Sequence, residues 1–135
     1  MIQNKIKGVG VALITPFNNF EVDYPALERM VEHVIAGGVD YIVALGSTAE
    51  TATLSLKERQ QVYDFIVERT ADRVPIVVGM GSNNTHELVE QLRTFVNEVT
   101  ERLEAAVALK ADKTALKSLE DKVTEVENTH AEDVQ

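Results

Sequence analysis

The sequence contains no cysteine and no tryptophan among its 135 residues. The absence of cysteine excludes disulfides, thiolate catalysis and cysteine metal sites. Three scattered histidines include no H-x-x-x-H pair, so we expect no zinc site and no cofactor. Basic residues are also few, 13 against 22 acidic ones, and the net charge of -9 disfavours binding to nucleic acid or to an anionic membrane.

Long hydrophobic runs are absent as well. No apolar run approaches the ~18 residues of a membrane helix, and the start, MIQNKIKGVG, lacks the core of a signal peptide. The sequence therefore predicts a cytoplasmic protein. Its composition, 44% hydrophobic and 26% charged, is typical of a globular chain of about one domain.

Residues 96–135 lack glycine, proline and aromatic side chains, all of which occur only in residues 1–95. A segment of that composition has no turn chemistry and little with which to fill a core. We therefore predict an α/β segment over 1–95, a helical and coiled-coil-like tail over 96–128, and disorder over 129–135. The first boundary falls inside a helical pattern near Phe95.

Short apolar runs alternate with helical patterns in the first segment. The predicted strands are 8–14, 41–45 and 75–80, and the predicted helices are 25–36, 56 to about 70, and one that begins near 84 or 85. Continuous apolar runs of this length are typical of parallel strands buried on both faces. The order (βα)3 fits either a doubly wound sheet or a slice of a TIM (β/α)8 barrel, whose closure typically needs ~250 residues.

Local signals mark the helix ends. Asp23 is a candidate N-cap for the first helix, and Gly37 and Gly38 are expected to stop it. Ser55 followed by Glu58 matches a capping box, which predicts a second helix from Leu56.

The loops that follow the predicted strands carry the chemical signal. Gly46, Ser47 and Thr48 follow the second strand, and two hydroxyls beside a glycine turn can bind a small carboxylate. The alternative is that these hydroxyls only cap the backbone. The G-x-G after the third strand lacks a third glycine and is a weak phosphate signal.

Three stretches, GVGVALITPF, VDYPALERMVEHVIAGGVDYIVALGSTAETATLSLKER and VPIVVGMGSNNTHELVE, together resemble the N-terminal third of the dihydrodipicolinate synthase / N-acetylneuraminate lyase family. The resemblance covers about residues 4–95. It implies a (β/α)8 barrel, usually a homotetramer, and a pyruvate-dependent class I aldolase that forms a Schiff base between a lysine and pyruvate. In the synthase, that adduct condenses with aspartate semialdehyde on the path to lysine.

The resemblance also implies roles for individual residues. Ser47 matches the hydroxyl of the family's proton relay, and Thr48 matches the hydroxyl that binds the pyruvate carboxylate. Gly46 and Glu50 match a G-x-x-G-E frame, in which Ala49 replaces the second glycine.

Further positions match by the same resemblance. Ala12 and Thr15 stand at walls of the active site, at the end of the first strand. Asn83 and Glu87 match positions that bind the feedback inhibitor lysine in some members.

The family's Schiff-base lysine has no counterpart among the seven lysines. None of them follows a predicted strand: they are Lys5, Lys7, Lys57, Lys110, Lys113, Lys117 and Lys122. An aldolase lysine needs an apolar pocket in which its pKa can fall. We therefore expect the chain to lack lyase activity.

The tail suggests a second kind of function. Its spaced apolar residues, Val99, Leu103, Leu116, Leu119 and Val123, form two short stripes that are out of phase. They fit either a solvated helix or a self-association helix that makes the protein a homo-oligomer. The alternative to a pyruvate-dependent lyase is therefore a non-enzymatic oligomerisation or structural protein with a helical stalk.

Overall fold

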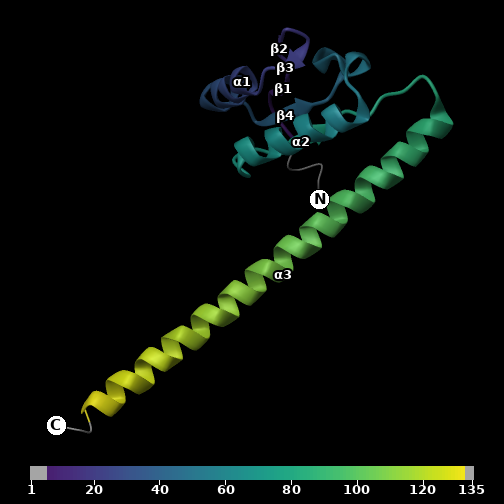
Figure 1. Cartoon of the computed structure of the whole chain (residues 1–135). Coiled ribbons are helices and arrows are strands. Elements are labelled where there is room, and N and C mark those ends of the chain that lie inside the picture. The colour runs from purple at the N-terminus through teal and green to yellow at the C-terminus, as the bar shows by residue number, and fades with distance from the viewer. Residues whose placement is uncertain (1–5, 133–135) are drawn as a thin grey trace. The chain divides into compact units, whose positions relative to one another are not determined.

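The computed structural model describes residues 6–132, and within its last helix it describes side chains up to Ala105 and at a few later positions. The chain divides into two compact units, Met1–Asn84 and Thr85–Gln135. Figure 1 shows the elements of both.

Three parallel strands form the centre of the first unit, as the sequence predicts. They are β1 (Gly10–Ala12), β4 (Tyr41–Ala44) and β5 (Ile76–Val78), in the order β1-β4-β5. Val11 lies opposite Ile42, which lies opposite Ile76. The strands are shorter than the predicted apolar runs 8–14, 41–45 and 75–80, because only part of each run pairs with a neighbouring strand.

The two helices of this unit begin and end where the local signals place them. Helix α1 spans Tyr24–Ala36, and the Asp23 carboxylate accepts from the backbone N–H of Ala26 at 2.9 Å. It stops at Gly37 and Gly38, and Gly38 has a φ of 84°.

Helix α2 spans Leu56–Thr70 behind the predicted capping box. It packs beside α1, and Arg69 of α2 and Arg73, just beyond its end, pair with two glutamates of α1. Arg69 lies 3.1 Å from Glu28, and Arg73 holds both carboxylate oxygens of Glu32 at 2.8 and 2.6 Å.

The core lies between these helices and one face of the sheet. Leu27, Val31 and Ile42 have no exposed surface, and Val62 and Ile66 are 1% exposed. The other sheet face is more open. Alternation along the strands explains the difference, because neighbouring residues of a strand point to opposite faces.

A small hairpin was not predicted. Strands β2 (Phe17–Asn18) and β3 (Glu21–Val22) are antiparallel and follow β1 directly. Their turn holds Asn19 and Phe20 at φ 49° and 66°. A bulky residue rarely adopts that conformation, so the sequence gives no ordinary turn signal here.

The second unit is one helix, α3 (Thr85–Glu132), of 48 residues. At 1.5 Å per residue it is roughly 72 Å long. The helix begins at Thr85, where the two compact units divide, and the predicted boundary near Phe95, where the composition changes, lies inside it. Residues 129–132 are helical, whereas disorder was expected from 129 onward, and residues 133–135 lie outside the described part.

Candidate functional site

Loops from all three parallel strands meet at one edge of the sheet, because parallel strands end on the same side. Two backbone hydrogen bonds fix this edge. The N–H of Leu13 donates to the carbonyl of Val43 at 3.0 Å, and the N–H of Gly79 donates to the carbonyl of Ala44 at 2.7 Å. The segments that follow β1, β4 and β5 therefore leave the sheet together.

The Gly46-Ser47-Thr48 segment forms a short 3-10 turn at this edge. The turn, η2 (Ser47–Ala49), is closed by the N–H of Ala49, which donates to the carbonyl of Gly46 at 3.0 Å. Ser47 and Thr48 are exposed, whereas Ala49 is 2% exposed. Two hydroxyls are thus presented to solvent on a turn whose far end is buried.

Ala49 suits its position although the resemblance places glycine there. Ala49 is not among the described non-glycine residues with positive φ, whereas the neighbouring Glu50 has a φ of 54°. Alanine therefore closes this turn without backbone strain.

Thr15 fastens the turn from the end of β1. Its side chain is 3% exposed, and its hydroxyl donates to the carbonyl of Ala49 at 2.7 Å. The place of Thr15 in the wall of an active site remains a prediction. Its hydroxyl proton is donated to Ala49 and so stabilises the turn. The bond links residues 34 apart in the sequence.

Gly79, after β5, packs against the backbone that leads into the same turn. A Cβ at this position would lie 2.6 Å from the carbonyl oxygen of Leu45 and 2.7 Å from the Cα of Gly46. Only glycine lets the end of β5 approach this closely without moving backbone atoms. The sequence suggested a weak phosphate loop here, whereas the structure gives Gly79 a packing role.

Behind the turn, Arg59 steadies a second 3-10 turn, η3 (Thr51–Thr53). The Nε–H of Arg59 donates to the carbonyls of Thr51 and Leu54 at 3.1 and 3.2 Å. These two hydrogen bonds could not be predicted from the sequence, because the position of an arginine on a helix does not indicate which loop carbonyls its side chain contacts.

The capping box that follows has an electrostatic consequence. The Glu58 carboxylate accepts from the hydroxyl and the N–H of Ser55 at 2.7 and 2.8 Å. These hydrogen bonds hold the pKa of Glu58 below its usual value. Burial, with a smaller contribution from the Glu58 charge, raises the pKa of Tyr24.

The other predicted site residues, Ala12, Asn83 and Glu87, lie outside the Gly46-Ser47-Thr48 turn. Ala12 is exposed and lies opposite Val43 on the open sheet face. Asn83 is exposed near the end of the first unit, and Glu87 is in the first turn of α3, in the second unit. Their pairing in an inhibitor site therefore remains a prediction.

The resemblance implies a lysine as the nucleophile. The four lysines whose side chains are described, Lys7, Lys57, Lys117 and Lys122, are all exposed. None of these four is in a segment that directly follows a strand of the sheet.

Among the described residues, no group of three or more histidine, cysteine, aspartate or glutamate side chains could hold a metal ion. Within the same residues, no helix has the length and apolar character to cross a membrane.

The chain matches the model of the Dihydrodipicolinate synthetase family over residues 5–127. The 4-hydroxy-tetrahydrodipicolinate synthase of Flavobacterium psychrophilum is 53% identical over 88 residues, which are 64% of this chain and 30% of the relative. A crystal structure of dihydrodipicolinate synthase superposes with a TM-score of 0.64 at 44% identity, over 70% of this chain and 32% of that one. The structure of the Acinetobacter baumannii synthase in complex with pyruvate has a TM-score of 0.60 at 42% identity, over 63% of this chain and 30% of that one.

These findings define an α/β protein built as a (βα)3 slice of a TIM barrel and followed by a long helix. The chain belongs to the dihydrodipicolinate synthetase family. It spans about a third of the length of the curated relatives that it matches.

Proposed function

We propose that this chain carries the carboxylate-binding part of a pyruvate-dependent lyase of lysine biosynthesis, the class I aldolase that condenses pyruvate with aspartate semialdehyde. Thr48 binds the carboxylate of a pyruvate-like ligand, and Ser47 stands at the proton-relay position. One observation carries the proposal: both hydroxyls are exposed on a turn held by Thr15 and Gly79. The pyruvate complex of the A. baumannii relative supports the choice of ligand.

The chemistry of the turn fits a small anion. A carboxylate accepts hydrogen bonds from hydroxyls and from backbone N–H groups at the start of a helical turn. Gly46 has an extended backbone, with φ -73° and ψ -176°, and leads directly into that turn. We expect weak binding, with a Kd of about millimolar. Ser47 and Thr48 are exposed, and the proposed contacts to the carboxylate include no positively charged side chain.

Catalysis is a separate matter, and we propose that this chain does not perform it. Schiff-base chemistry needs an amine activated by an apolar pocket or a neighbouring cation. The described lysines are exposed and lie away from the strand ends. In the same proposal the protein is cytoplasmic and needs no cofactor.

Titration with pyruvate, followed by NMR, tests the binding site. We expect the amide signals of Gly46 to Ala49 to shift in the native chain and to stay unchanged in a Ser47→Ala/Thr48→Val double variant. Ser118→Ala, an exposed serine on α3, is the control and retains the shifts. Equal shifts in the double variant would remove the basis for this site.

Borohydride reduction in the presence of pyruvate tests the absence of catalysis. We expect the mass of the protein to stay unchanged, because no described lysine is in a suitable pocket. A stoichiometric adduct on one lysine would show that the chain retains the family's nucleophilic chemistry.

The length of α3 favours the second candidate, a non-enzymatic oligomer with a helical stalk. Its exposed apolar residues include Val96 and Leu103, which are 51% and 61% exposed. The side chains of Leu116, Leu119 and Val123 lie outside the described set. If α3 joins copies of the chain, light scattering gives at least twice 14.9 kDa, and Val96→Glu/Leu103→Glu lowers that mass. A monomer unaffected by both changes excludes this function.

A further inference from the structure

The sheet of the first unit has an open face and two open edges that the proposed site does not use. In the described part of the chain, β1 and β5 each pair only with β4. Gly10 and Ala12 of β1 are exposed, and Val43 and Val77 of the neighbouring strands are only half-buried. A parallel sheet is normally covered on both faces, so this surface resembles an unfilled interior more than an ordinary protein surface.

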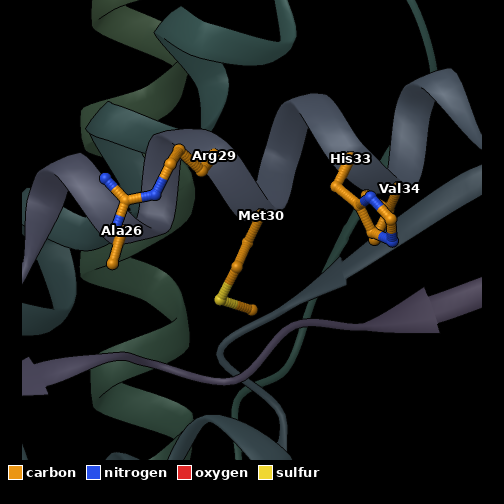
Figure 2. A pocket seen from close by; sticks show the side chains of 5 residues that line it. All are labelled: Ala26, Arg29, Met30, His33 and Val34. Atoms are coloured by element: carbon orange, nitrogen blue, oxygen red, sulfur yellow. The ribbon is translucent and has the colours of Figure 1, made fainter.

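Helix α1 has a groove on one flank (Figure 2). The groove, of about 440 Å³, is lined by Ala26, Arg29, Met30, His33 and Val34. These residues recur every three or four positions and so share one side of the helix. Glu28 and Glu32, which pair with Arg69 of α2 and with Arg73 beyond its end, lie on the opposite side. Thus α1 has its helical neighbour on one flank and an apolar groove on the other.

We propose that this unit binds, in trans, a second polypeptide that carries the remaining five βα units of a family barrel. Eight strands close a TIM barrel, and each helix of its outer ring contacts a helix on both sides. The partner's strands would pair with the free edges of β1 and β5, and one of its helices would fill the α1 groove. The proposal rests on family membership and not on pyruvate binding.

The solved relatives indicate what covers this surface. This chain covers 32% of one synthase structure, so the other two thirds of that protein complete the same fold. A second copy of this chain is a poorer fit. Copies add strands in threes, which cannot give eight, and each copy carries a net charge of -9.

The test co-expresses the full chain, tagged, with the part of the F. psychrophilum synthase that lies outside the 88 matched residues. We expect the two polypeptides to purify together as a 1:1 complex by native mass spectrometry and light scattering. Recovery of the tagged chain without the fragment, or only as its own oligomer, would overturn the proposal.

Two variants locate the interface. Ala12→Arg puts a charge on the open sheet face, and Ala26→Glu puts one in the α1 groove, where an acidic residue in the first turn also favours the helix. Each should weaken the complex about tenfold or more, because Ala12→Arg buries a charge in the interface and the larger side chain of Ala26→Glu occupies the groove. Gln61→Arg, on an exposed position of α2, is the matched control and should change the Kd by less than about twofold.

Circular dichroism of each variant alone checks that α1 and α2 remain folded. Equal affinity of Ala12→Arg and Gln61→Arg would show that the open sheet face is not the interface, and would overturn the proposal. A complex that forms without any pyruvate-induced NMR shift leaves this inference intact and removes the proposed function. Pyruvate binding without formation of the complex overturns this inference and leaves the proposed function intact.

Discussion

In the α/β unit, ten apolar side chains are 7% exposed or less, whereas on α3 Val89, Leu92, Val96 and Leu103 are 39% to 61% exposed. The first unit is held by contacts between residues far apart in the sequence. The described part of α3 is held chiefly by its own backbone hydrogen bonds, which link residues four apart. Helices of that kind owe their stability to propensity and length. The same substitution should therefore have different effects in the two regions.

Removal of a core side chain should produce the largest contrast. Leu27 has no exposed surface, so Leu27→Ala should lower the free energy of unfolding of the first unit by about 2–5 kcal/mol. Leu92→Ala on α3, at a site 47% exposed, should change the free energy of unfolding of the first unit by less than about 0.5 kcal/mol. All three tyrosines lie in the first unit, so tyrosine fluorescence during urea unfolding reports on that unit. Equal losses would contradict the contrast.

A methyl group at Gly79 should have the next largest effect. Gly79→Ala places a Cβ against the backbone of Leu45 and Gly46 and should cost about 1–3 kcal/mol. Gly81→Ala is the control, because a Cβ there meets nothing within 4 Å. Urea unfolding of both variants, measured as above, decides whether the close approach matters.

Loss of the Thr15 hydroxyl sharpens the comparison at the candidate site. Thr15→Val keeps the volume but leaves the carbonyl of Ala49 without this donor, at a cost of about 1–3 kcal/mol. Thr48→Val, on an exposed residue of the same turn, should leave the stability nearly unchanged. The reverse order of effects would mean that Thr15 does not hold the turn.

The loss of the Glu32–Arg73 pair at low pH should have the smallest effect on the stability of the first unit. The hydrogen bonds from Arg73 hold the pKa of Glu32 below its usual value, as Ser55 does for Glu58. A carboxyl whose pKa is lower in the folded state stabilises it fully above the ordinary value of about 4.3, and this contribution is lost as the pH falls through the folded pKa. Glu32→Gln should therefore flatten the fall in Tm between about pH 5 and pH 3, as thermal melts can show. An unchanged slope would exclude a contribution from this pair.

The local features of the fold could be predicted from the sequence because their signals are local. The Ser55 and Glu58 pair gives the start of α2 at Leu56, and two glycines give the end of α1. The positions of the three strands follow from their apolar runs. The β2–β3 hairpin could not be predicted, because its turn uses Phe20 at a positive φ.

The candidate site is predictable only in part, for the same reason. The order of strands and loops places Ser47 and Thr48 at the carboxyl edge of the sheet. The contacts that hold this loop come from residues distant in the sequence. Thr15 donates to Ala49, 34 residues away, and Gly79 lies against the backbone of Leu45 and Gly46. Such pairings depend on the folded sheet and leave no periodic signal in the sequence.

Hydrogen exchange at single amides tests most directly the claim that a packed parallel sheet supports the site. The amides of Leu13, Ile42 and Gly79 donate across the three strands to Val43, Pro75 and Ala44. We expect these three to be among the slowest to exchange, and the described amides of α3 to exchange much faster, because opening the sheet requires loss of the core. Fast exchange at all three sheet amides, with protection confined to α3, would contradict the account.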